Sequence, residues 1–190
     1  MGVKGLTSFV HDDCLNQVFD HIKLHNTLLL IDGFSFLHQV HFNHNIQCAF
    51  GGNYDQLADK LSAILRLMLK CHIKPIVVLD GGEDLDDRKF NTRLERIGKR
   101  QEQIVHLNQS TICSPSQQIS EAQSIAKNIL PIMAYKVLED VLNELGIIYF
   151  PTIFEADYEL VCLANRLDCP LLSLDSDFYV YDLKQGYISI

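Results

Sequence analysis

The chain has 190 residues, of which 47% are hydrophobic, enough apolar material for the core of a folded domain. Its longest apolar runs, such as LLLI (28–31) and GIIYF (146–150), are too short to span a bilayer, and residues 1–13 lack a signal-peptide core, so we expect a nuclear or cytosolic protein. The formal net charge of −8 argues at first against a nucleic-acid partner, although where the charges lie matters more than their sum.

Short apolar runs alternate with segments of helical periodicity along the first half of the chain. TLLLID (27–32) and PIVVLD (75–80) predict buried strands, and the apolar residues from Leu57 to Leu69 recur at the spacing of one helix face. A long charged helix is predicted from about Asp87 to Leu107, and the polar stretch NQSTICSPSQQ follows it.

The second half continues the alternation. It predicts a helix over 137–145, the strand IIYF, a helix over 160–167 and the strand PLLSLD (170–175). Continuous apolar strands separated by amphipathic helices predict an α/β fold, with a mostly parallel central sheet and helices on both faces.

An acidic side chain lies at or just after the end of each predicted strand. In a parallel sheet the carboxyl ends of the strands meet at the edge where ligands bind. We therefore expect six carboxylates to share one rim: Asp32, Asp80, Glu155, Asp157, Asp175 and Asp177. Two ionised carboxylates about 4 Å apart repel by roughly 4 kcal/mol at an effective dielectric of about 20, so either they splay apart or cations hold them.

Oxygen ligands without cysteine suit magnesium or manganese. Six acids are enough for two ions, and such a pair promotes phosphodiester hydrolysis by activating a water and stabilising the leaving oxygen. The structural alternative is that each aspartate is a turn or helix-capping residue, and Asp32 and Asp80 each precede glycine. Glu159 is a spare candidate, because it shares a helix face with Glu155.

A basic segment, RKFNTRLERIGKR (88–100), begins a few residues after Asp80. Such a run supplies phosphate contacts without sequence preference, although a solvated helix face is the alternative. Its start near the acidic rim favours a metal-dependent nuclease. Its cations are Arg88, Lys89, Arg93, Arg96, Lys99 and Arg100.

Three weaker patterns leave alternatives open. His38, His41 and His44 recur every third residue, which permits either a metal-binding face or a partly buried helix stripe. The turn AFGGNYD (49–55) lacks the G-K-[ST] of a phosphate loop, so Asn53 or Tyr54 is expected to start the next helix. The six cysteines include no C-x-x-C pair and predict buried or free thiols.

These blocks together resemble the flap endonuclease or XPG-like superfamily, within the wider PIN-like fold. MGVKGL resembles its N-terminal motif, and IDG (31–33), VLDGG (78–82), FEADYE (154–159) and SLDSDF (173–178) match its acidic blocks in order and approximate spacing. FGGNYD, VVLDGGED and CPLLSLDSDFYVYDL look most like the asteroid homolog 1 branch. The resemblance covers nearly the whole chain except residues 108–130.

The resemblance implies a single PIN-like nuclease domain over residues 1–190, with a charged, arch-like insertion at about 84–130. It implies hydrolysis of branched or flap DNA in nuclear DNA repair, with two Mg²⁺ ions, or Mn²⁺, held by the six carboxylates, and it favours Asp157 over Glu159. It places Gly2 and Lys4 near the substrate junction and the basic segment in an arch over the single strand.

The sequence also departs from the family pattern. His38 stands where an aromatic residue, often tyrosine, is expected to stack on a base. The acids of GGEDLDD follow Asp80 and would repel phosphate, and the family's last acid and helical DNA-binding motif would come after Ile190. A non-catalytic PIN-like scaffold that binds nucleic acid or protein is therefore the alternative. A D-x-D phosphatase is disfavoured, because few residues follow Asp177 to supply its lysine.

Overall fold

The computed structural model of the chain describes residues 6–13, 22–46, 52–81, 94–95, 97–99, 101–102, 105, 129–153 and 156–189. The chain forms two compact units. The first is built from residues 1–36, 63–82 and 142–190, and the second from residues 37–62 and 83–141. No helix within the described ranges is both long and apolar enough to cross a membrane.

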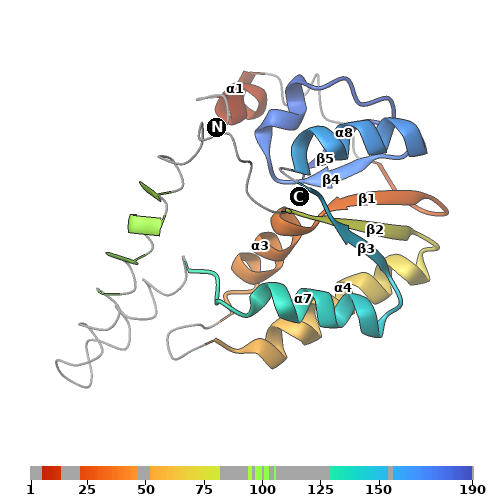
Figure 1. Ribbon diagram of the computed structural model, residues 1–190. Helices are drawn as coiled ribbons and strands as arrows, with labels where there is room; N and C mark the ends of the chain where they lie inside the picture. Colours follow the sequence, from red (N-terminus) through yellow and green to blue (C-terminus); the bar gives the residue numbers. More distant parts are fainter. Residues whose placement is uncertain are drawn as a thin grey trace. The chain divides into compact units, whose positions relative to one another are not determined.

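Five parallel strands form one sheet in the first unit, in the order β3-β2-β1-β4-β5 (Figure 1). The chain steps outward from β1 to β3, then returns to place β4 on the other side of β1. The direction of winding therefore reverses between β1 and β4, and the carboxyl ends of strands at such a reversal form the usual ligand crevice. The strands are β1 (Leu28–Asp32), β2 (Lys74–Leu79), β3 (Ile148–Pro151), β4 (Leu171–Ser173) and β5 (Tyr187–Ser189).

Helix α8 (Ala156–Leu167) packs on one face of this sheet (Figure 1). Its Leu160 and Ala164 join Leu30 and Leu171 in a buried cluster. Burial of each such leucine stabilises the fold by about 1.5–3 kcal/mol. The alternate β1 residues 29 and 31 are equally buried, so the centre of the sheet is covered on both faces, which confirms the predicted α/β class.

Strand β3 differs from the buried strand that its apolar sequence predicts. Among the described strands it pairs with β2 alone, and its Ile148 and Phe150 are 66% and 37% exposed. The difference arises because β3 is the edge of the sheet, where a strand has a neighbour on one side only. An apolar run therefore indicates a strand here but not its full burial.

Several elements escaped the sequence pattern. Two helices connect β1 to β2: α3 (Gly33–Asn43), which was suggested only by the helix stripe of His38, His41 and His44, and α4 (Tyr54–Lys70). Helix α1 (Leu6–Asp13), the short 3₁₀ helix η2 (Ser176–Val180) and strand β5 were also not predicted, because each is too short to show a clear period.

The predicted start of α4 is confirmed. The backbone N–H of Gln56 donates to the side-chain oxygen of Asn53 at 3.1 Å, the geometry of an N-terminal cap. The predicted helix near residue 137 is α7 (Ala134–Glu144). The charged helix expected over 87–107 is described only in fragments, which are helical at residues 94–95, 97–99, 101–102 and 105.

Candidate functional site

Asp32 ends β1 at the winding reversal, and its buried carboxylate is hydrogen-bonded on both oxygens. Oδ1 accepts the backbone N–H groups of Phe34 and Ser35, each at 3.1 Å, so Asp32 caps the start of α3. Oδ2 accepts the hydroxyls of Ser35 at 2.6 Å and of Ser173 at 2.7 Å. Four donors therefore occupy the roughly four lone-pair sites of this carboxylate.

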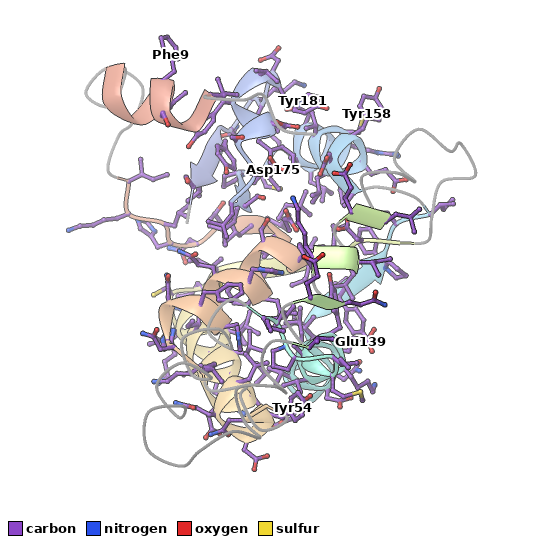
Figure 2. All side chains as sticks on the ribbon, turned by 90° about the vertical axis from the view of Figure 1, so that its left-hand side faces the viewer. Phe9, Tyr54, Glu139, Tyr158, Asp175 and Tyr181 are labelled. Atoms are coloured by element: carbon purple, nitrogen blue, oxygen red, sulfur yellow. The ribbon has the colours of Figure 1, made fainter. Side chains whose placement is uncertain are left out.

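The turn after β4 carries the D-x-D pair. The backbone N–H of Asp175 donates to the Ser173 hydroxyl oxygen at 3.1 Å, and the N–H of Asp177 donates to Asp175 Oδ1 at 3.0 Å. Asp175 is thus the N-cap of η2 and lies between the end of β4 and the start of that helix (Figure 2). Among the described residues, no hydrogen bond to Oδ2 of Asp175 is found, so this oxygen can accept a ligand.

The side-chain hydroxyl of Tyr187, in β5, donates to the backbone of the same turn. Its hydroxyl lies 2.9 Å from the carbonyl oxygen of Ser173 and 3.1 Å from that of Asp175, and its single proton is shared between them. Burial of the ring raises the pKa of Tyr187, so the hydroxyl remains a donor at any physiological pH.

Asp80 follows β2 and reaches the start of α8. Its Oδ1 accepts the backbone N–H of Ala156 at 3.2 Å, and Asp157 comes next, in the first turn of that helix. The adjoining Gly81 donates its N–H to Thr152 Oγ1 at 3.0 Å. A Cβ at Gly81 would overlap the carbonyl oxygen of Thr152, so this crossing of two strand ends requires glycine.

The structure therefore brings together part of the predicted site. Asp32 and Asp175 share one hydrogen-bond network through Ser173, and Asp80 joins the helix that carries Asp157. Lys99 is exposed. The remaining predicted residues Gly2, Lys4, Arg88, Lys89, Arg93, Arg96, Arg100 and Glu155 lie outside the described residues.

The donor chemistry at this edge of the sheet fits a hard divalent cation. Asp80, Asp157, Asp175 and Asp177 offer carboxylate oxygens, which Mg²⁺ and Mn²⁺ prefer. Across the part of the chain that the structure describes, no three His, Cys, Asp or Glu side chains form a group that could hold a metal ion. A cation here would thus need further oxygen ligands, which for Mg²⁺ commonly include water and substrate phosphate.

The three regularly spaced histidines occupy different environments on and after α3. His41 is buried, His38 is half-buried with its ring centroid 5.1 Å from that of Phe42, and His44 is exposed. This graded burial supports the helix stripe, and within the described residues the three form no metal-binding group. Neither ring nitrogen of His41 has a well-formed hydrogen bond among those residues.

Burial lowers the pKa of His41, and the backbone of Ile129 partly opposes this shift. The His41 imidazole therefore binds a proton less readily in the folded state than in the unfolded state. We expect the free energy of unfolding to fall as pH drops below about 6.5, by at most about 1.4 kcal/mol per pH unit. Urea unfolding followed by circular dichroism at pH 7.5, 6.5 and 5.5 measures the effect. His41→Leu should flatten this dependence, whereas His44→Gln should not. Identical dependence in His41→Leu and the parent chain would contradict the assignment.

Four residues of this region were missed by the sequence reasoning: Ser35, Thr152, Ser173 and Tyr187. None is acidic, so none stands out as a metal ligand. One signal was available for Ser173, because a serine inside the apolar strand LLSLD is buried and must find a hydrogen-bond partner.

Comparisons with known proteins show which family the sequence resembles. The profile of the XPG N-terminal domain family matches residues 1–103. The chain is 36% identical over 194 residues to Single-strand DNA endonuclease ASTE1 of Mus musculus, covering 100% of this chain and 26% of that protein. It is 32% identical to Protein asteroid of Drosophila melanogaster, over 97% of this chain and 20% of that protein. The chain spans about a fifth to a quarter of the length of these relatives.

Solved structures show the same fold. The catalytic core of Rad2 in complex with DNA substrate matches with a TM-score of 0.50 and 18% identity, over 81% of this chain and 42% of that one. Human GEN1 in complex with Holliday junction DNA matches with a TM-score of 0.53 and 14% identity, over 94% of this chain and 39% of that one. At these identities the likeness concerns the fold.

Proposed function

The chain belongs to the XPG-like family of nucleases with a PIN-like fold, and from this premise we propose that it is the catalytic portion of a divalent-metal-dependent, flap-type DNA endonuclease. One observation supports the proposal above the others. Asp32 ends β1, Asp80 follows β2 and Asp175 lies in the turn after β4, so each comes at the carboxyl end of a strand in a sheet whose winding reverses between β1 and β4.

The carboxylates of this region have two roles in the proposal: they bind cations, and they form hydrogen bonds that position neighbouring elements. Asp80, Asp157, Asp175 and Asp177, with Glu155 from the sequence, would bind Mg²⁺ or Mn²⁺, two ions in all. The sixth predicted ligand, Asp32, would bind a cation only if some of its protein donors were displaced. Bound metal supplies a nucleophilic water at neutral pH and neutralises charge on the leaving oxygen of the phosphodiester. Asp80 also accepts a hydrogen bond from the Ala156 N–H, which links the end of β2 to the first turn of α8, where Asp157 lies.

The substrate proposed is DNA with a branch or a single-stranded flap, cut during repair in the nucleus. The name of the mouse relative specifies single-strand DNA. The basic segment 88–100 supports phosphate contacts that do not depend on sequence, and His38 offers a half-buried ring that could stack on a base.

Cleavage of labelled 5′-flap, 3′-flap, duplex and single-stranded DNA, with Mg²⁺, Mn²⁺ or EDTA, tests the proposal. We expect metal-dependent cleavage of the flap substrates that Asp80→Ala abolishes, because this change removes a carboxylate from the strand ends. Asp59→Ala, at an exposed position on α4, is the matched control and should cleave as the parent does.

Equal cleavage by Asp80→Ala and the parent would reject the proposal. Metal-independent binding of the same DNAs with no product in either metal would instead identify a non-catalytic scaffold. The net charge of −8 weakens attraction to DNA phosphate, so among non-catalytic scaffolds it favours one that binds protein.

A further inference from the structure

We propose that Ser35, Ser173 and Tyr187 are positioning residues that hold Asp175 in place for cation binding, with Asp32 as their buried anchor. We refer to Asp32 and these three residues as the serine clamp. The inference rests on the proposed function, since it assigns Asp175 a cation to bind. It goes beyond that function by giving a role to three residues that carry no charge.

Asp32 is the anchor of the serine clamp. Both oxygens of Asp32 are engaged by donors from its own segment and from β4, and the side chain is 8% exposed. A direct bond from Asp32 to a cation would require some of these donors to be displaced. Asp32 is therefore suited to act through its neighbours.

The two serine hydroxyls connect the anchor to Asp175. The Ser35 and Ser173 oxygens lie 2.6 and 2.7 Å from Asp32 Oδ2, and each hydroxyl has one proton that it can donate to this carboxylate. The two hydroxyl oxygens are also within hydrogen-bond distance of each other, at 3.0 Å. A lone pair of the Ser173 oxygen is then free to accept the backbone N–H of Asp175. Ser173 thus joins the β1 carboxylate to the backbone of the D-x-D turn.

Tyr187 completes the restraint from β5. Its hydroxyl shares a proton between the carbonyls of Ser173 and Asp175, while its ring packs against Phe178 and Tyr179 at centroid distances of 5.7 and 5.1 Å. The backbone at Asp175 is therefore held at both its N–H and its carbonyl.

The orientation of the Asp175 carboxylate follows from this restraint. Oδ1 accepts the N–H of Asp177, and Oδ2 has no hydrogen bond among the described residues. The two aspartates therefore differ: protein donors occupy all the acceptor sites of Asp32, whereas Oδ2 of Asp175 has no donor among the described residues. Partners that orient a metal-binding side chain commonly contribute about 10–100-fold to metal affinity or activity.

Two measurements on the whole chain test the clamp. The first is hydrogen exchange in EDTA, where Ser173→Ala should speed exchange in peptides covering 174–181, because the Asp175 N–H loses its acceptor. The second is Mn²⁺ binding measured by electron paramagnetic resonance, where Ser173→Ala and Ser35→Ala should each raise the Kd by about 10-fold or more. Ser173→Thr keeps the hydroxyl and should restore both readouts toward the parent values.

Tyr187→Phe removes a single hydroxyl and keeps the ring packing, so it serves as a further test if Ser173→Ala does not fold. It should raise the Kd for Mn²⁺ as well. Ser62→Ala, on α4, is the control for replacing a serine and should change neither readout.

The outcomes separate this inference from the proposed function. A parent chain that neither binds Mn²⁺ nor cleaves DNA would reject the proposed function, and the clamp's role in cation binding with it. A parent chain that binds Mn²⁺, loses it in Asp175→Asn, and keeps parental Kd values in Ser35→Ala, Ser173→Ala and Tyr187→Phe would overturn the clamp alone.

Discussion

Asp175→Asn is expected to leave the fold unchanged and to lower the cleavage rate by about 10³-fold, equivalent to about 4 kcal/mol of transition-state stabilisation. Asn caps helices about as well as Asp, so the hydrogen bond from the Asp177 N–H is kept and stability should change by less than about 0.5 kcal/mol. The amide replaces a charged carboxylate by a neutral group, and so weakens the binding of a cation. The rate on a flap substrate and the urea midpoint are the two measurements.

Two companion variants distinguish the roles of this side chain. Asp175→Ala removes the cap as well as the charge, so it should lose about 1 kcal/mol of stability besides the activity. Asp182→Asn, at an exposed aspartate after η2, controls for the loss of one negative charge and should retain activity. If Asp175→Asn cleaves at the parental rate while Asp175→Ala is merely less stable, Asp175 is a capping residue and nothing more.

The fold was largely accessible from the sequence, because continuous apolar runs between amphipathic segments are typical of parallel α/β sheets. Strand order was not accessible. The placement of β4 beside β1, which creates the winding reversal, depends on pairing between residues about 140 positions apart, such as Leu30 with Leu171. The fifth strand was missed because its three residues are too few to show a strand pattern in the sequence, and they are recognised as a strand by their pairing with β4.

The candidate site divides in a similar way. Acids stand out in a sequence at the ends of apolar strands, and the structure places Asp32, Asp80 and Asp175 at those ends. The position of an aspartate in the sequence does not tell whether protein donors occupy its carboxylate oxygens or leave them open to a ligand. The difference between Asp32 and Asp175 arises from Ser35 and Ser173, whose contact with Asp32 exists only after β1 and β4 have paired.

Gly81→Ala should be among the most destabilising single changes in the described part of the chain. The added methyl group would overlap the carbonyl oxygen of Thr152, a backbone atom that no side-chain rotation can move away. Overpacking in protein interiors typically costs about 1–3 kcal/mol, and we expect at least about 3 kcal/mol here because strand ends must separate. Urea unfolding of the variant against the parent measures this loss.

Displacement of the Gly81 backbone should also shift Asp80, because the two residues are adjacent. The Gly81 N–H is hydrogen-bonded to Thr152 Oγ1. Gly146→Ala is the informative comparison, since that glycine has open space around it but a φ of +65°. Its cost is conformational, about 1–2 kcal/mol, and should leave Mn²⁺ affinity intact. Gly81 presents the opposite case, in which space alone excludes a side chain. Gly81→Ala should therefore lose both stability and Mn²⁺ affinity, and adding Thr152→Ala should recover neither. Recovery in that double variant would locate the conflict in the threonine side chain and refute a backbone crossing that requires glycine.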